Sequence, residues 1–213
     1  MDVLQRFYDC GVVPVVVLDD VKDAVPTAKA LLAGGVDVME ITFRTAAAAD
    51  AIRAVAEGCP EMLVGAGTVL DVAQAQTAVK MGARFIVAPG FDEETVRWCV
   101  ENGVAVTPGC VTPSEIMAAM KLGVNAVKFF PAGTFGGAKA LKSLAAPFAG
   151  IKFVPTGGVD AGNLAEYAAV PATLAVGGSW LCLKKDIAAG NFAHITELCR
   201  EARQIVEKAR KPK

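Results

Sequence analysis

Short apolar runs rich in β-branched residues recur eight times along the chain, and this repetition limits its possible folds more than any other feature. Each run is apolar throughout, which is typical of a parallel strand covered on both faces. A strand with one face in water would instead alternate apolar and polar residues. We therefore expect strands at residues 12–18, 36–42, 63–69, 85–89, 105–109, 126–132, 152–158 and 174–180.

Segments with helical spacing separate these runs, so strand and helix alternate along the chain. We expect these helices at residues 21–33, 47–57, 72–80, 93–101, 113–122, 137–144 and 161–168. A short helix at residues 1–10 is expected to cover one end of the sheet, and a last helix is expected at 191–208. Glycines follow the helical segments, where a left-handed residue can end a helix, at Gly34, Gly35, Gly58, Gly82, Gly103, Gly123 and Gly150.

This alternation predicts an α/β fold, a closed (β/α)8 TIM barrel with a short N-terminal helix, in which residues 1–213 form a single domain. An open doubly wound sheet would more typically stop at about five or six strands. The spacing of about 20–27 residues also overlaps that of leucine-rich repeats, but their L-x-x-L-x-L frame is absent. In such a barrel, functional residues lie at the C-terminal ends of the strands and in the loops that follow.

The charge of the chain limits its partners. Its formal net charge is −1 without a basic cluster, so we expect a small neutral or anionic molecule as partner rather than nucleic acid or a membrane surface. The apolar runs are far shorter than the roughly 18–20 residues that span a bilayer. The first residues, Met1 to Arg6, lack the basic start and apolar core of a signal peptide, so we expect a cytoplasmic protein.

Cysteine and histidine usage excludes several kinds of site. The six cysteines contain no C-x-x-C pair, and we expect them to be small buried hydrophobic residues in a reducing compartment rather than metal ligands or disulfides. His194 is the single histidine, which excludes a three-histidine zinc site and an H-E-x-x-H protease. A Ser-His-Asp triad would have to use this residue, which we expect to be a surface or interface residue of the last helix.

Lys128 lies inside an apolar strand run, whereas the other lysines lie in helices, loops or at strand edges. Burying an ammonium group is costly, so the group either finds a partner or loses its proton, and the neutral amine attacks carbonyls. This predicts an imine between Lys128 and a 2-keto acid. The alternative is an internal salt bridge to Glu40, which is compatible with catalysis because a lysine and a neighbouring carboxylate can exchange protons.

Polar side chains follow two neighbouring strands at their C-terminal ends. Side chains alternate along a strand, so Glu40 and Thr42 share one face, and Arg44 continues the series if the chain stays extended. We expect Glu40 and Arg44 to point into the barrel mouth, with an internal Glu40–Arg44 ion pair as the alternative. Thr68, after the next strand, offers a hydroxyl and a backbone N–H to a bound anion.

Paired glycines follow the last two strands, in the segments P-T-G-G at 155–158 and G-G-S-W at 177–180. Glycine lets backbone N–H groups approach phosphate oxygens, and a following helix N-terminus adds a favourable dipole. Loops at these two places form the usual phosphate site of a TIM barrel. The segments therefore predict a phosphate site, the alternative being two tight turns without a ligand.

Together these motifs resemble the 2-keto-3-deoxy-6-phosphogluconate (KDPG) aldolase family, which includes bifunctional 4-hydroxy-2-oxoglutarate (KHG) aldolases. The motifs are E-x3-R at 40–44, G-A-G-T at 65–68, K-F-F-P at 128–131 and the two glycine segments. The resemblance runs from about residue 11 to the last helix. It implies a class I aldolase that cleaves KDPG to pyruvate and glyceraldehyde 3-phosphate, and KHG to pyruvate and glyoxylate.

The resemblance also implies roles for the individual residues. Lys128 would form the Schiff base and Glu40 would be the general acid and base, while Arg44 and Thr68 would hold the pyruvate carboxylate. No metal and no organic cofactor is expected, because the imine itself accepts the electrons of the broken bond. The family is typically a homotrimer.

The rest of the substrate would lie farther out in the barrel mouth. By the same resemblance, Thr156 would lie near the substrate hydroxyls, and the phosphate near Gly157, Gly158, Gly178 and Ser179. The loop G-T-F at 133–135 departs from the pattern of this family, on the aldehyde side of the pocket.

Four other functions are weighed against this one. They are an aldolase for the galactonate epimer of KDPG, a metal-dependent pyruvate aldolase, a phosphate-binding barrel isomerase and a non-catalytic sugar-phosphate-binding barrel. The metal-dependent enzyme would need a second acidic ligand at a strand end. An isomerase or a binding protein would leave Lys128 without a task.

Overall fold

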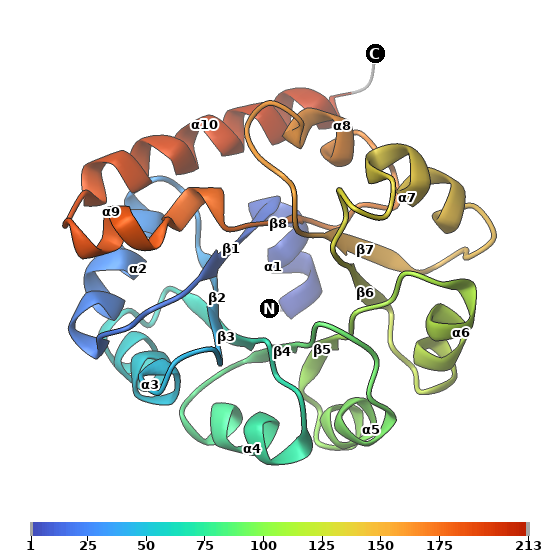
Figure 1. Ribbon diagram of the computed structural model, residues 1–213, viewed down its shortest axis with the longest axis horizontal. Coiled ribbons are helices and arrows are strands. Elements are labelled where there is room, and N and C mark those ends of the chain that lie inside the picture. Colours follow the sequence, from blue (N-terminus) through green and yellow to red (C-terminus); the bar gives the residue numbers. More distant parts are fainter. Residues whose placement is uncertain (1, 212–213) are drawn as a thin grey trace.

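The computed structural model describes residues 2–211, while Met1, Pro212 and Lys213, at the ends of the expected domain range, lie outside the described residues. Its strands form a ring with the helices around the outside, as Figure 1 shows. Every expected strand is present, and the predicted TIM barrel is confirmed. The strands are β1 (Val12–Val16), β2 (Val38–Thr42), β3 (Leu63–Gly67), β4 (Phe85–Val87), β5 (Ala105–Thr107), β6 (Ala126–Phe129), β7 (Lys152–Pro155) and β8 (Val176–Gly178).

Parallel pairing closes the ring in chain order. Six strands pair in the order β5-β4-β3-β2-β1-β8, and β6 pairs with β7. Single bridges from Gly109 to Lys128 and from Thr156 to Gly177 join these two sheets. The strands are shorter than the expected runs. Most of them end early, because the last residues of the run form loops at the mouth of the barrel, whereas β2 begins two residues late and ends where expected.

The helices surround the barrel and largely follow the sequence prediction. Residues 72–80 and 93–101 are helical with the expected bounds, whereas the helix expected from residue 161 begins at Leu164, and two short helices after β8 were not predicted. The helices are α1 (Val3–Cys10), η1 (Val21–Asp23), α2 (Ala24–Ala33), α3 (Ala48–Gly58), α4 (Val72–Lys80), α5 (Glu93–Glu101), α6 (Pro113–Lys121), α7 (Gly137–Ala145), α8 (Leu164–Ala168), η2 (Trp180–Cys182), α9 (Lys184–Ala188) and α10 (Phe192–Arg210).

Side-chain caps explain several of these helix starts. Asp71 accepts a hydrogen bond from the backbone N–H of Gln74 at the start of α4. Thr112 and Glu115 form a capping box at the start of α6, in which each side chain accepts from the backbone N–H of the other residue. Such caps satisfy N–H groups that have no partner within the helix.

The prediction of left-handed glycines after the helices is partly wrong. Positive φ angles occur at Gly35, Gly82, Gly103, Gly123 and Gly150, as expected. Gly34, in contrast, has a φ of −87°, and a Cβ there would lie 2.4 Å from Cβ of Cys199. Gly58 is the last residue of α3, and a Cβ on it would lie 3.0 Å from Val25. These two glycines allow close packing rather than a left-handed turn.

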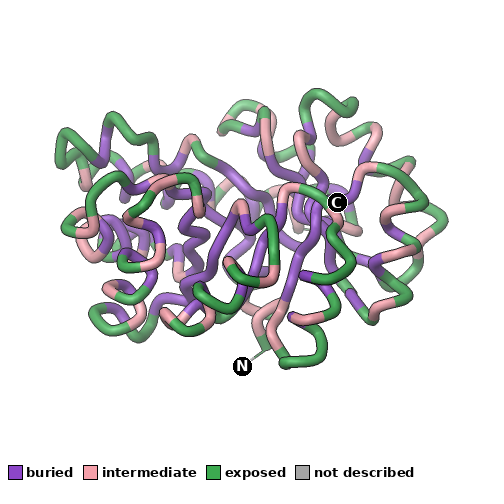
Figure 2. The backbone as a smooth tube through the Cα atoms, turned by 60° about the horizontal axis from the view of Figure 1, so that its bottom comes forward, coloured by how far each residue is buried: buried purple, intermediate pink, exposed green. Residues whose placement is uncertain are grey.

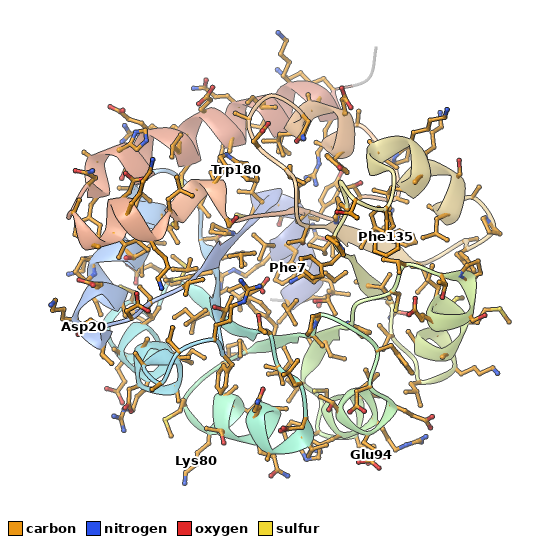
Figure 3. All side chains as sticks on the ribbon, in the orientation of Figure 1. Phe7, Asp20, Lys80, Glu94, Phe135 and Trp180 are labelled. Carbon is orange, nitrogen blue, oxygen red and sulfur yellow. The ribbon has the colours of Figure 1, made fainter. Side chains whose placement is uncertain are left out.

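The helix expected at residues 1–10 is α1, and it covers the floor of the barrel. Figure 3 shows Phe7 near the middle of the ring, while Lys80 and Glu94 lie at its outer edge. The ring of Phe7 packs edge-on against Phe85, with 4.8 Å between ring centroids. Figure 2 shows that the buried parts of the chain gather inside and the exposed parts lie on the outer turns. The core therefore lies between the strands and the inner faces of the helices.

The expected burial of the cysteines and the expected position of His194 on the last helix are both found in the structure. All six cysteines are buried and unpaired, and burial raises the pKa of both Cys99 and Cys110 to about 12. His194 is exposed on α10. Among residues 2–211, no helix is both long enough and apolar enough to cross a membrane.

Candidate active site

Lys128 and Glu40 meet inside the barrel, from β6 and β2. The Nζ atom of Lys128 donates a hydrogen bond to Oε1 of Glu40 over 3.4 Å, and the two residues are 5% and 2% exposed. The same Nζ atom lies 5.1 Å from the centroid of the Phe130 ring. The salt bridge that was the alternative reading of Lys128 is therefore present, next to an aromatic wall, and it places a proton-exchanging carboxylate beside the amine.

A glycine in β3 makes room for the Glu40 side chain. Glu40 is the register partner of Gly65, and the following inward position of β3 is Gly67. A Cβ on Gly67 would lie 2.0 Å from Oε1 of Glu40, so any larger residue would displace the carboxylate. The G-A-G-T segment therefore positions Glu40 by leaving space beside it.

Arg44 and Thr68 lie together at the ends of β2 and β3. The Nε atom of Arg44 donates to Oγ1 of Thr68 over 3.2 Å. Thr68 has a φ of 56°, a left-handed conformation that costs energy in a non-glycine residue and that often occurs at functional sites. Within residues 2–211 no ion pair joins Arg44 to Glu40, so that alternative is wrong. The Arg44 guanidinium is available to an anion.

The two glycine loops close the outer side of a cavity of about 250 Å³. Gly157 and Gly158 both have left-handed φ angles, of 89° and 74°. A Cβ on Gly177 would lie 2.1 Å from Oγ1 of Thr156, whose hydroxyl donates to the carbonyl of Val154. The residues that line the cavity are Val15, Arg44, Lys128, Phe130, Thr156, Gly157, Gly158, Val159, Gly178 and Ser179.

The structure thus brings the predicted site residues together. Seven of them line the cavity, while Glu40 and Thr68 lie behind it in contact with Lys128 and Arg44. The sequence analysis named no site role for Val15, Phe130 and Val159, because it searched the strand ends for polar groups. Val15 is the register partner of Glu40 in the neighbouring strand, a relationship that the sequence does not show.

The expected helix dipole at the phosphate loops is met in part. After β7, the helix α8 begins only at Leu164 and has five residues. After β8, the three-residue η2 begins directly behind Ser179. Any anion at this end of the cavity would therefore be bound chiefly by loop N–H groups, the Ser179 hydroxyl and nearby cationic side chains.

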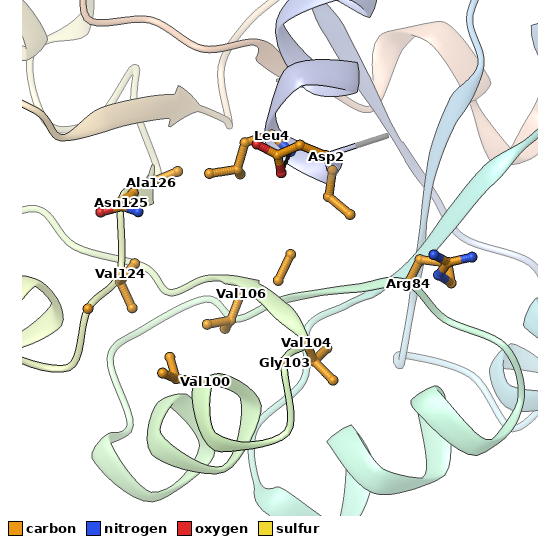
Figure 4. Close-up of a pocket in the computed structure, with 13 residues that line it drawn as sticks. Asp2, Leu4, Arg84, Val100, Gly103, Val104, Val106, Val124, Asn125 and Ala126 are labelled. Atoms are coloured by element: carbon orange, nitrogen blue, oxygen red, sulfur yellow. Dashed lines mark hydrogen bonds between the residues drawn. The ribbon is translucent and has the colours of Figure 1, made fainter.

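A larger cavity of about 410 Å³ lies at the opposite end of the barrel, between α1 and the starts of β5 and β6 (Figure 4). Most of the residues that line it have apolar side chains, and its charged residues are Asp2 and Arg84. It lacks a buried amine and lies at the N-terminal ends of the strands, where conserved features of TIM barrels serve stability. Among the described residues, no three His, Cys, Asp or Glu side chains gather as metal ligands would.

Comparison with known proteins gives a consistent family. A family model described as "KDPG and KHG aldolase" matches residues 3–198. The 2-dehydro-3-deoxy-phosphogluconate aldolase of Treponema pallidum is 49% identical over 195 residues, which cover 92% of this chain and 93% of that protein. The KHG/KDPG aldolase of Escherichia coli (strain K12) is 46% identical over 191 residues, or 90% of each chain.

A solved structure shares both the fold and a clear sequence similarity. It is the KDPG aldolase of Legionella pneumophila, with pyruvate captured at low pH as a covalent carbinolamine intermediate. It superposes with a TM-score of 0.90 at 38% identity, covering 94% of this chain and 97% of that chain. The similarity therefore extends over nearly the whole barrel, including every element that contributes to the cavity.

Proposed function

The chain belongs to the KDPG and KHG aldolase family, and from this premise we propose that its carbon–carbon lyase reaction proceeds through an imine on Lys128. The observation that carries this proposal is the contact of Lys128 with Glu40 beside a cavity at the barrel mouth. The carbinolamine in the Legionella homologue supports it, because a carbinolamine is the adduct of an amine and a carbonyl. Among the described residues, Lys128 is the only lysine that lines this cavity.

Imine formation is the first half of the proposed reaction. The neutral Nζ atom of Lys128 adds to the keto carbon of the substrate and forms a carbinolamine. Glu40, in its protonated form, gives a proton to the carbinolamine hydroxyl, which leaves as water. The product is a protonated imine, which draws electrons from the neighbouring carbon–carbon bond.

Cleavage and release form the second half. The Glu40 carboxylate takes the proton from the C4 hydroxyl, directly or through water, while the electrons of the C3–C4 bond move toward the imine nitrogen. The aldehyde leaves and an enamine stays on Lys128. Protonation of the enamine at C3 and hydrolysis of the imine then release pyruvate and the free amine.

The remaining site residues are proposed to hold the two ends of the substrate. Arg44 and Thr68, joined by a hydrogen bond, suit the carboxylate next to the keto carbon, because a guanidinium can pair with a carboxylate through two N–H groups. Thr156 lines the same cavity and is proposed to lie near the substrate hydroxyls.

The phosphate end is proposed to lie in the two glycine loops. Gly157 and Gly158 have positive φ angles, and without side chains they allow a phosphate oxygen to approach their backbone N–H groups. Gly178 and Ser179 line the same cavity. A phosphate site of this kind suits KDPG as the preferred substrate, with pyruvate and glyceraldehyde 3-phosphate as products. Cleavage of KHG to pyruvate and glyoxylate is proposed as the second activity.

Borohydride reduction in the presence of pyruvate tests the imine. We expect a mass increment of one reduced pyruvate, located on the peptide that contains Lys128, and we expect activity to persist in EDTA. A mass increment on another residue, or activity abolished by EDTA, would reject the proposal. Cleavage of KDPG by the protein would also exclude the alternative of a non-catalytic sugar-phosphate-binding barrel.

Substrate preference is tested separately. Steady-state cleavage of KDPG, its galactonate epimer and KHG should give the highest kcat/KM for KDPG. If the galactonate epimer were cleaved faster, the alternative aldolase would be the correct assignment, while the imine proposal would stand.

The assembly is proposed to be a homotrimer of single-domain chains that span residues 1–213. Large apolar side chains are exposed on α5, α6 and the loop before α7, at Val100, Met117, Met120 and Phe135, and a subunit contact would cover them. Light scattering should give a molar mass of three times the 22.0 kDa of one chain, and thermal unfolding should show one transition.

We also propose a cytoplasmic location, which suits six unpaired cysteines and can be tested by cell fractionation.

A further inference from the structure

Thr42, the last residue of β2, has a buried hydroxyl without a hydrogen-bond partner. Thr42 is 0% exposed, and no hydrogen-bond donor or acceptor among the described residues pairs with its Oγ1 atom. Buried hydroxyl groups are normally paired, since an unpaired one loses its hydrogen bonds to water and gains none in return. Such an exception needs an explanation, and a role in the reaction is one when the group lies next to an active site.

The side chain of Thr42 faces the inside of the barrel. Glu40 and Lys128 contact each other from β2 and β6, on opposite sides of the ring, so both side chains point inward. Side chains alternate along a strand, and Thr42 lies two residues after Glu40. Its hydroxyl is therefore on the inner face, one step nearer the mouth than the base of the Glu40 side chain.

The Glu40 carboxylate extends toward Thr42. The register partner of Thr42 in β3 is Gly67, and a Cβ on Gly67 would lie 2.0 Å from Oε1 of Glu40. The carboxylate has therefore reached the level of the Thr42–Gly67 pair. Because Gly67 has no side chain, nothing from β3 separates the carboxylate from the Thr42 hydroxyl.

We propose that Thr42 is a positioning residue that donates a hydrogen bond to the Glu40 carboxylate once Lys128 has become an imine. An ionised carboxylate accepts hydrogen bonds only, and a hydroxyl can supply one donor. In the free enzyme that donor is Lys128, over a long 3.4 Å. When Nζ bonds to the substrate carbon it loses protons and turns toward the substrate, and Thr42 then keeps the carboxylate aimed at the reacting carbon atoms. This inference rests on the proposed role of Glu40.

The exchange of the pyruvate methyl protons with solvent deuterium is a half-reaction that isolates this role. NMR spectroscopy measures its rate. The exchange needs the imine and a base that removes the proton from C3, but no aldehyde. Thr42→Val replaces the hydroxyl with a methyl group, and we expect exchange to slow about tenfold, with KM for pyruvate within about twofold of the unmodified protein. Thr42→Ser keeps the hydroxyl and should restore the exchange rate to within about twofold.

Thr173→Val is the matched control. Thr173 also has a buried hydroxyl without a hydrogen-bond partner. Its backbone forms a β-bridge with Phe153 near the start of β7, away from the mouth of the barrel. Its variant should exchange pyruvate protons at the unmodified rate. Unchanged exchange in Thr42→Val, or an equal loss in Thr42→Ser, would overturn the inference, since the second result would indicate a packing effect.

Two further measurements keep the test decisive. Glu40→Gln should exchange slowly, and if it exchanged normally the proposed function of Glu40 would fail rather than the role of Thr42 alone. Should Thr42→Val not fold, a crystal structure of the unmodified protein with reduced pyruvate on Lys128 decides the matter. We expect Oγ1 of Thr42 within about 3.2 Å of a Glu40 carboxylate oxygen, and a separation above about 4 Å would overturn the inference.

Discussion

The Nζ atom of Lys128 lies 3.4 Å from Oε1 of Glu40, and this contact joins two strands that are 88 residues apart in the sequence. Both side chains are almost completely shielded from water. An ion pair in such a place stabilises the fold little, because desolvation offsets the attraction, yet the loss of one partner leaves an uncompensated charge. The pair therefore couples the stability of the barrel to its chemistry.

The stability of the barrel should depend on the pair as a unit. Lys128→Met should lower the free energy of unfolding by about 3 kcal/mol, because Glu40 stays buried without its partner. The double variant with Glu40→Gln should recover at least half of this loss. Urea denaturation of the single and double variants measures the coupling, and additive effects would contradict it.

Glu40→Gln should separate imine formation from turnover. We expect cleavage of KDPG to slow at least about 100-fold, because a neutral amide cannot exchange protons with the intermediates. Reductive trapping of pyruvate should still be detectable, since Lys128 is intact. Glu207→Gln, on the exposed face of α10, is the control and should cleave KDPG at the unmodified rate. Normal turnover of Glu40→Gln would show that its assigned role is wrong.

Gly67→Ala should act on catalysis through Glu40. The new Cβ would lie 2.0 Å from Oε1 of Glu40, so the carboxylate must move away from Lys128. We expect kcat for KDPG to fall at least about tenfold. Gly90→Ala is the matched control, because a Cβ on Gly90 meets no atom within 4 Å, and its kcat should stay within about twofold. Equal kcat values for the two variants would contradict the packing argument.

Arg44→Ala should weaken binding of the keto acid. Loss of a charge-assisted hydrogen bond is expected to raise KM for pyruvate in the exchange reaction about 10- to 100-fold. The KM of Arg44→Lys should lie between those of the unmodified protein and Arg44→Ala, because lysine keeps the charge but lacks the paired N–H groups. An unchanged KM for Arg44→Ala would place the carboxylate elsewhere in the cavity.

Ser179→Ala should affect phosphorylated substrates selectively. We expect KM for KDPG to rise about tenfold, since one hydrogen bond to a charged phosphate is lost, and KM for KHG to stay within about twofold. The ratio of the two KM changes is the measurement. If both KM values rose equally, Ser179 would contact a part of the substrate that KDPG and KHG share.

Much of the fold was readable from the sequence because it depends on local periodicity. The apolar runs marked every strand, and the bounds of α4 and α5 were predicted directly. Two glycines were misread, since Gly34 and Gly58 look like helix ends in the sequence but are required by contacts with Cys199 and Val25. Those contacts involve residues far away in the chain, which no local pattern records.

Side-chain direction alternates with each residue of a strand, so the order of residues was enough to predict which groups of the site face the barrel interior. It left open whether Glu40 would pair with Arg44 or with Lys128. The closed barrel decided this, since the tilt and stagger of its strands bring β2 and β6 to the same level, while Arg44 turns away to Thr68. Distances across the ring depend on closure of the whole sheet, and only the tertiary structure contains that information.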